Sequence, residues 1–501
     1  MAPSKTIRAE HAAVASEQPL ATLAAYDVLK RGGNAFDAAV ATSFTLAVTF
    51  HPAGGLGGDF FGMLYEAKTG EVHCLNGSGW APSGLTLDLV KSMGNDIPQF
   101  GPLTCMVPGF VAGVWEMHRK LGTEDFGKLL SQPLEYASAG FPAGDGICRS
   151  VEGAYSELSK EAKAVFAPKG RPLAPGDRVR QENLGRVISE VAALGPDGFY
   201  SGWPASKVSD TMEDLGVEWK KEDLRDFKPE WVEPLKLDYR GTTVYEMPPN
   251  SMGATCLLML KLLEDKGLSK TGPLSRQRIQ TTMGAVLTAY SRRDAILGDP
   301  RFSNIDLTKF MEADGQSEFP RSRISPGDTT VFSIVDAEGN LVSGIQSLFN
   351  HFGSRVFVPE CGIMLNNRGR GFSLSGPNSV QPRKRPLNTL SSMLLERDGR
   401  PYMAIGTSGG DYRPLQHTLF VTNAVDYGMP LEQVVGHPRF LWGGAKSLLI
   451  EAGYETPTSG GYDLQWLPMP GRTGVCQGVE ISENYRKAVC DPRGDGIPAG
   501  Y

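Results

Sequence analysis

The chain has 501 residues, with 50 Lys and Arg against 56 Asp and Glu, and a formal net charge of -6. Its basic residues are scattered and form no stripe that would neutralise a phosphate backbone, so nucleic acid is excluded as a partner. No window has the roughly 18 consecutive apolar residues of a membrane span. The polar start MAPSKTIRAE lacks the apolar stretch of a secretory signal, so we expect a cytoplasmic protein without a membrane segment.

Cysteine and histidine give no sign of a metal centre. The seven Cys are dispersed without a CxxC pair, and the seven His include no HExxH motif. We therefore expect reduced thiols, no metal site and no cofactor.

The N-terminal third opens with helices and a hairpin. Apolar residues recur at helical spacing from Gln18 to Lys30, and Asn34 is placed to cap a second helix that ends near Thr49. HPAGGLGGDFFGMLY then passes from a glycine-rich bend into a strand, and the turn EAKTGE leads back through VHCLNGS.

Further helices are expected at 108–122, 182–195, 254–267 and 279–299, with a strand at 242–249. After Asp328 the pattern changes to alternating strands, at 330–336, 341–347, 361–367, 391–397 and 401–408. Helices return at 414–428 and 430–435, and a strand is expected at 447–451. No repeat or linker separates these parts, so we expect residues 1–328 and 329–501 to share one core.

The junction between Asp328 and Thr329 has the residues needed for self-cleavage. A threonine hydroxyl is a weak nucleophile, but an N-terminal threonine carries its own base, an α-amine that titrates at about 7.7 to 8.0. Pro326 and Gly327 favour a tight turn that presents the Asp328 carbonyl to the Thr329 hydroxyl. On these residues alone, Asp-Thr-Thr is more typical of the start of an ordinary strand.

Eleven motifs in a fixed order resemble those of the γ-glutamyltranspeptidase family of N-terminal nucleophile hydrolases. They are GGNAFDAAVA, HPAGGLGGDFF, VPGFVAGVW, MPPNSMGA, AILGDPRF, DTTVFSIVDAEGN, GIMLNN, KRPLNTLSSM, GTSGGD, DYGMPLEQVVGHPRF and DPRGDG. The resemblance runs from Ala13 to the C-terminus and therefore covers nearly the whole chain.

This resemblance implies an α+β fold, the four-layer αββα sandwich, and a precursor cut into a large subunit, 1–328, and a small catalytic subunit, 329–501. It makes Thr329 the nucleophile and Ser347 the group that supports its amine. Gly409 and Gly410 match the glycine pair whose N–H groups form the oxyanion hole. An αβ pair from one precursor is implied, with a further dimer of such pairs left open.

The residues that bind the γ-glutamyl group in the family are replaced here. Ser78, with Trp80 two residues on, stands where the family has a carboxylate-binding arginine, and Phe349 replaces an asparagine. Arg368 and Gly371 replace the glutamine and aspartate that hold the substrate's amine, and Asn388 and Thr389 replace a pair of serines. Compared with the family's binding residues, these replacements remove a partner for the substrate's ammonium group and add a partner for an anion.

Four functions follow as hypotheses. The first is an amidohydrolase for a small or acidic amide such as oxamate, in which Arg368 binds the carboxylate unless it is a solvated surface arginine. The second is a γ-glutamyl hydrolase or transpeptidase with a pocket rebuilt from Asn388, Thr389 and Arg413. The third is a serine hydrolase, because GTSGG fits the nucleophile-elbow motif and Ser408, Asp426 and His437 have the right chain order. The fourth is a non-catalytic relic.

Overall fold

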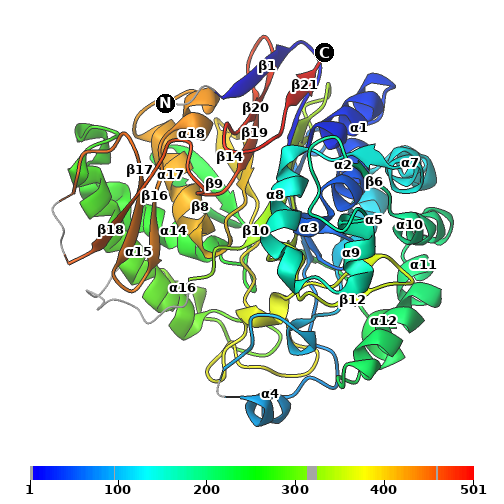
Figure 1. Ribbon diagram of the computed structural model, residues 1–501. Coiled ribbons are helices and arrows are strands. Elements are labelled where there is room, and N and C mark those ends of the chain that lie inside the picture. The colour runs from blue at the N-terminus through cyan, green and yellow to red at the C-terminus, as the bar shows by residue number, and fades with distance from the viewer. Residues whose placement is uncertain (1–3, 95, 313–323, 458–460) are drawn as a thin grey trace.

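Two seven-stranded antiparallel sheets stand at the centre of the molecule (Figure 1). The computed structural model describes residues 4–94, 96–312, 324–457 and 461–501. The strands of the first sheet are, in spatial order, β1 (Lys5–Ala9), β20 (Arg486–Cys490), β19 (Cys476–Ile481), β15 (Arg400–Thr407), β14 (Met393–Arg397), β9 (Thr242–Glu246) and β8 (Leu235–Tyr239). Those of the second are β21 (Pro498–Gly500), β2 (Ala13–Ser16), β10 (Asp328–Val335), β11 (Leu341–Phe349), β3 (Asp59–Glu66), β4 (Glu71–Gly77) and β7 (Glu230–Val232).

The two sheets pack face to face through an apolar layer. Val331 and Ile345 of the second sheet belong to the same buried cluster as Leu394, Ala404 and Val479 of the first. The central strands are buried on their outer faces as well: every residue of β11 is buried, and so is every residue of β10 after Asp328.

Helices cover the outer face of the second sheet (Figure 1). The predicted cap at Asn34 is confirmed: its side chain accepts from the N–H groups of Phe36 and Asp37, and the Asp37 carboxylate accepts from the N–H of Asn34. All of α2 is buried, because further helices lie outside it. The helices of this side are α1 (Pro19–Lys30), α2 (Ala35–Thr49), α3 (His51–Gly54), α5 (Phe110–Leu121), α6 (Phe126–Leu129), α7 (Ser131–Ala139), α8 (Asp145–Ala154), α9 (Lys160–Phe166), α10 (Glu182–Leu194), α11 (Asp197–Tyr200), α12 (Trp203–Asp214) and α13 (Lys221–Arg225).

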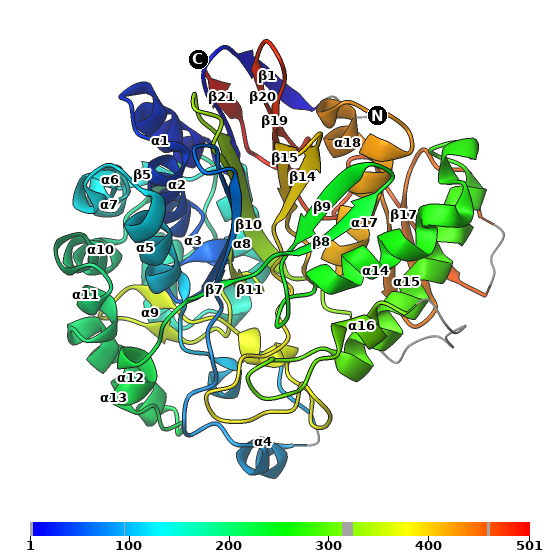
Figure 2. The same ribbon diagram turned by 180° about the vertical axis from the view of Figure 1, so that it is seen from behind.

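A second set of helices covers the first sheet, as the view from behind shows (Figure 2). They are α14 (Gly253–Leu263), α15 (Arg276–Ile296), α17 (Arg413–Val425) and α18 (Leu431–Gly436), with α16 (Leu307–Phe310) beside α15. A three-stranded sheet packs outside them: β16 (Phe440–Gly444), β17 (Ser447–Glu451) and β18 (Asp463–Leu467). Smaller elements are α4 (Leu87–Met93) and the strand pairs β5 (Phe141–Pro142) with β6 (Arg178–Val179) and β12 (Phe357–Val358) with β13 (Ile363–Met364).

The predicted αββα sandwich is therefore confirmed, and its two sheets interleave distant parts of the chain. In the second sheet β10 and β11 lie between β2 and β3, and in the first sheet β14 pairs with β9. The strand expected at 361–367 is only the two residues Ile363–Met364. Both sheets thus depend on segments from before and after Asp328.

Candidate functional site

The Asp328–Thr329 peptide bond lies at the start of β10, in the middle of the second sheet. Asp328 pairs with Phe349 and Thr330 with Gln346, so the register shifts at Thr329. Such a bulge re-aims a side chain out of the regular ladder. The strand begins at Asp328, two residues earlier than the sequence predicts, and Thr329 is 2% exposed.

Ser347 connects the Thr329 hydroxyl to the carbonyl of the bond before it. The Thr329 Oγ1 donates to Ser347 Oγ at 3.2 Å, and Ser347 Oγ donates to the Asp328 carbonyl oxygen at 2.8 Å. The N–H of Phe349 donates to the same Ser347 oxygen at 2.7 Å and fixes the hydroxyl rotor. The three groups form a short hydrogen-bonded chain from the nucleophile candidate to the carbonyl oxygen.

Phe349 itself has a strained backbone. Its φ of +82° is rarely adopted by a bulky residue, and it is 3% exposed. Positive φ at a buried aromatic residue persists only where the surroundings force it, and such positions concentrate at functional sites.

Arg413, the first residue of α17, also contacts Thr329. Its Nη2 lies 3.4 Å from Thr329 Oγ1, while its Nε donates to the Thr407 carbonyl at 2.7 Å. Burial and the nearby charge of Arg368 lower the pKa of the Arg413 guanidinium to about 9, which leaves it protonated at neutral pH. Thr329 therefore has a cation beside its hydroxyl.

The glycine pair lies against the segment that precedes Thr329. Both residues have positive φ, +127° at Gly409 and +57° at Gly410. A Cβ on Gly410 would collide with the backbone of Ser325 and Gly327, so only glycine allows this close approach. The Ser325 carbonyl accepts from the N–H of Asp411 at 3.1 Å. Ser325 and Gly327 thus cover Gly410 in the uncut chain, whereas Gly409 lines the larger cavity.

Arg368 is fully buried, and the interpretation of it as a solvated surface arginine is wrong. Its Nε donates to Asp59 Oδ2 at 3.0 Å and its Nη1 to Thr389 Oγ1 at 2.9 Å. Asn388 Nδ2 binds the same Asp59 oxygen at 3.0 Å, and the guanidinium carbon lies 4.7 Å from the centre of the Phe349 ring. Arginine is almost never fully buried unless it is paired, and here the Asp59 carboxylate supplies the pairing charge.

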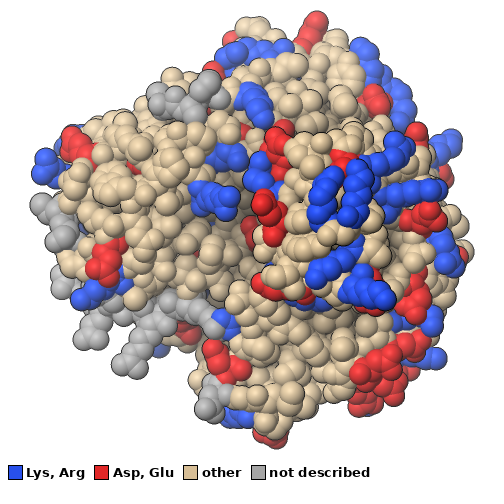
Figure 3. Space-filling view, viewed as in Figure 1, with Lys and Arg blue, Asp and Glu red and all other residues tan. Residues whose placement is uncertain are grey.

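Two cavities flank the segment before Thr329. The larger, of about 500 Å³, contains Asp328, Thr329, Ser408 and Gly409 in its wall. The smaller, of about 260 Å³, is lined by Phe349, Arg368, Gly371 and Thr389 and also touches Ser325. Figure 3 shows the molecule hollowed near the middle of one face, with charged residues of both signs around the rim.

Ser78 and Trp80 do not occupy the position expected of substrate ligands. The Ser78 hydroxyl donates to Asn76 Oδ1 at 2.7 Å and is fully buried, whereas the Trp80 indole N–H donates to the Asp223 carbonyl and its ring packs on Phe227. Neither residue lines the two cavities. Both side chains are held by other residues of the chain, and their role in substrate binding stays a prediction.

The Ser408, Asp426 and His437 triad is not assembled. Ser408 Oγ accepts from the Val475 N–H at 2.8 Å, Asp426 accepts from the Tyr239 hydroxyl at 2.8 Å, and His437 Nδ1 bonds to the Pro438 carbonyl. The strand before Ser408 also belongs to an antiparallel sheet, whereas a nucleophile elbow follows a strand of a parallel one.

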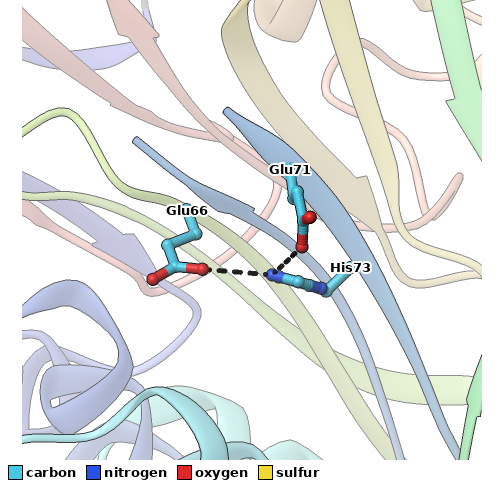
Figure 4. A group of neighbouring side chains, drawn as sticks. All are labelled: Glu66, Glu71 and His73. Atoms are coloured by element: carbon cyan, nitrogen blue, oxygen red, sulfur yellow. Dashed lines mark hydrogen bonds and ion pairs between the residues drawn. The ribbon is translucent and has the colours of Figure 1, made fainter. Parts of the chain in front are cut away.

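One group of side chains has the residue types of a metal site, on the β3–β4 hairpin (Figure 4). His73 Nε2 lies 3.4 Å from Glu66 and 3.7 Å from Glu71. Its Nδ1 lies 3.3 Å from Lys120 Nζ, which can only donate. In the neutral ring Nε2 then carries the proton and faces the carboxylates, so His73 offers no lone pair to a metal between them.

Sequence reasoning missed three residues of this region. Asp59 lies in the motif HPAGGLGGDFF, and its position after a glycine-rich bend is a possible signal of a partner for a buried cation. Glu17 lines the larger cavity, and burial raises the pKa of its carboxyl. Arg149 lies on the same wall and had no sequence signal.

The fold is that of the N-terminal nucleophile hydrolases. The solved cephalosporin acylase of Bacillus halodurans superposes with a TM-score of 0.90 and 28% identity, over 99% of this chain and 97% of the acylase.

A model of the gamma-glutamyltranspeptidase family matches residues 21–501, and the chain belongs to that family. Its members are hydrolases and transferases that act on amide bonds, and so is this enzyme. The glutathione hydrolase-like YwrD proenzyme of Bacillus subtilis is 33% identical over 97% of this chain and 98% of its own length. The oxamate amidohydrolase proenzyme of Klebsiella pneumoniae is 27% identical over 98% of both chains.

Among the described residues, no helix combines the length and apolarity needed to cross a bilayer.

Proposed function

We propose that this chain is the precursor of an amidohydrolase and that it cuts itself between Asp328 and Thr329. The observation that carries the proposal is the hydrogen-bonded chain from Thr329 through Ser347 to the Asp328 carbonyl. The Thr329 oxygen attacks the Asp328 carbonyl carbon, and the Ser347 hydroxyl stabilises the negative charge that develops on its oxygen. The C–N bond breaks with the proton passing to nitrogen, and water then hydrolyses the resulting ester.

The products are a carboxylate on Asp328 and a free α-amine on Thr329. That amine titrates at about 7.7 to 8.0, so it accepts the hydroxyl proton when Thr329 attacks a substrate amide. The backbone N–H groups of Gly409 and Gly410 stabilise the oxyanion after residues 325–327 have left the surface that they cover. Ser347 keeps its place beside the amine. The two fragments form an αβ pair.

The acyl group of the substrate is a small acidic one, as in oxamate. Two features support this choice: the cavity around Arg368 measures only about 260 Å³, and this cavity contains a buried guanidinium. The oxamate amidohydrolase of Klebsiella pneumoniae is a relative over the full length. Thr389 and Asn388 complete the pocket by holding Arg368 and Asp59.

A γ-glutamyl group is the second candidate, because several relatives are glutathione hydrolase proenzymes. Its α-ammonium needs an acid in the acyl pocket. Asp411 and Asp294 line that cavity, but both carboxylates already bind Arg293, at 2.8 Å and 2.7 Å, and Asp411 also accepts from the Ser325 N–H at 2.9 Å.

Mass spectrometry of the purified protein tests self-cleavage. Two fragments, 1–328 and 329–501, are expected from the wild type and an intact chain of 54.1 kDa from Thr329→Ala. An intact wild-type chain would support the non-catalytic relic. Cleavage of the Thr329→Ala variant would remove Thr329 from the mechanism.

A panel of amides tests the acyl group on the cleaved protein. Ammonia release from oxamate is expected to exceed p-nitroaniline release from a γ-glutamyl anilide. Arg368→Ala should raise the KM for oxamate about 10- to 100-fold, the range for a hydrogen bond to a charged group. Arg385→Ala is the matched control, since it removes an equally buried guanidinium that lines neither cavity. Unchanged KM in Arg368→Ala would exclude the binding role.

The cytoplasmic location remains a proposal, and fractionation of the native host cells tests it. Size-exclusion chromatography of the cleaved protein tests whether αβ pairs assemble further.

A further inference from the structure

Two buried guanidinium groups each keep one nitrogen without a partner among the described residues; Arg413 lies beside Thr329, and Arg368 lies against the ring of Phe349. These atoms are Arg368 Nη2 and Arg413 Nη1, and both residues are 1% exposed or less. A buried N–H group that is left unsatisfied costs free energy, and the cost is larger for a charged donor. Each arginine is otherwise held firmly, Arg368 by Asp59 and Thr389 and Arg413 by Thr407.

The charges of these two arginines are not balanced in the same way. Arg368 forms an ion pair with Asp59 at 3.0 Å. Arg413 forms no ion pair within 4.0 Å in the described part of the chain, and the charge of Arg368 acts on it unfavourably. Glu246 and Asp411 offset the charge of Arg413 only from longer range. Two like charges that are buried together call for an anion between them.

We propose that Arg368 and Arg413 form one carboxylate site directly beside the nucleophile, and that this site selects short monoamides of dicarboxylic acids. The inference rests on the proposed function and deepens it, because it assigns Arg413 a role in specificity and limits the length of the acyl group.

The position of Arg413 sets that length. Its Nη2 lies 3.4 Å from Thr329 Oγ1. In an ester on Thr329, a carboxylate bonded directly to the acyl carbon has its oxygens about 3 Å from Oγ1, within reach of this guanidinium. Each added methylene moves the carboxylate about 1.3 Å farther along an extended chain. Oxalyl and malonyl groups therefore keep their charge within reach of Arg413, whereas an extended glutaryl group carries its charge past it.

Phe349 limits the site on the other side. Its ring lies 4.7 Å from the Arg368 guanidinium carbon and packs near Gly327. A longer acyl chain would have to displace this ring, whose backbone is fixed by the N–H bond to Ser347. The apolar wall also offers no partner to an ammonium group on the substrate.

The test measures binding of oxalate, malonate, succinate and glutarate to the cleaved protein by isothermal titration calorimetry. Affinity is expected to fall with length, with oxalate at least about tenfold tighter than glutarate, the difference that one charge-assisted hydrogen bond provides. Hydrolysis rates of oxamate, malonamate, succinamate and glutaramate should follow the same order. Equal or tighter binding of glutarate by the wild type overturns the proposal without any variant.

Arg413→Gln and Arg413→Lys locate the site. Oxalate binding should weaken about 10- to 100-fold in Arg413→Gln, and glutarate binding should change much less. Arg413→Lys keeps the charge but loses the fork geometry, so an intermediate loss is expected. Arg472→Gln is the control, because Arg472 is an exposed arginine on the wall of the larger cavity. A uniform loss for all four acids in Arg413→Gln would indicate a structural role and reject the proposal.

The two proposals fail in different ways. If no amide is hydrolysed but oxalate binds through both arginines, only the proposed function is lost. If oxamate is hydrolysed but Arg413→Gln leaves the length preference intact, only the paired-arginine site is lost.

Discussion

Ser347→Ala should slow self-cleavage while leaving the fold intact. The substitution removes the hydroxyl that donates to the Asp328 carbonyl at 2.8 Å and accepts from Thr329 at 3.2 Å. In enzymes, loss of one such donor to a developing oxyanion lowers the rate by about 10²- to 10³-fold, or about 2.7 to 4 kcal/mol. The same range is expected here, because the Ser347 hydroxyl is buried and oriented by the Phe349 N–H.

The assay follows conversion of the fresh precursor to fragments 1–328 and 329–501 by gel electrophoresis and mass spectrometry. Ser343→Ala is the matched control: Ser343 lies on the same strand, is equally buried and donates to Ile405 instead of the scissile bond. Ser347→Thr should retain cleavage, because it keeps the hydroxyl. Cleavage of Ser347→Ala at the wild-type rate, or equal slowing in Ser343→Ala, would refute the assigned role.

Three further outcomes are expected. Gly410→Ala should block cleavage, because its Cβ collides with Ser325 and Gly327. Gly428→Ala is the control and should cleave normally, since Gly428 also has positive φ but open space around it. Gel electrophoresis compares the two variants, and cleavage of Gly410→Ala would contradict the packing argument. Asp491→Ala should lose about 3–5 kcal/mol in urea unfolding, because Arg439 is left buried without its acid, while Arg493 retains only Glu451. Burial alone would raise the pKa of Asp491, but the charges of Arg439 and Arg493 outweigh burial and lower this pKa. The stability of the wild type should therefore fall as the pH drops below about 4, and Asp491→Asn should lose part of that pH dependence. Neither Zn²⁺ nor a chelator should change the melting temperature, since His73 donates to Glu66 and Glu71. A rise with Zn²⁺ that is lost in His73→Ala would show that this group binds a metal.

Local signals predicted most of the longer helices and many of the strands, but few of the short helices. The helix that Asn34 caps begins one residue after it and ends at Thr49, as predicted, because the cap and the apolar run are encoded within a few residues. The strands at both ends of the chain were not predicted. β1 pairs with β20 and β2 with β21, and each of these pairs joins residues that are more than 470 positions apart. Short strands of this kind are fixed by their partners and carry little pattern of their own.

The same limit applied to the site. The resemblance named Thr329, Ser347 and the glycine pair from their motifs, and the structure places Thr329 beside Ser347 and in one cavity wall with Gly409. It did not foresee that the Ser78 side chain binds Asn76, since a match in position does not say where a side chain points. It also left Arg368 undecided between pocket and surface, because the partner that buries this residue, Asp59, lies 309 residues away.

The proposed cut between Asp328 and Thr329, at the head of a central strand, would change the kinetic order of refolding. Before the cut, both sheets close within a single chain, and refolding after denaturation is independent of concentration. After the cut, β10 and β11 on one fragment must find β2 and β3 on the other. Recovery of the mature enzyme then becomes a second-order encounter, slower on dilution, whereas the uncut chain regains its sheets at any concentration.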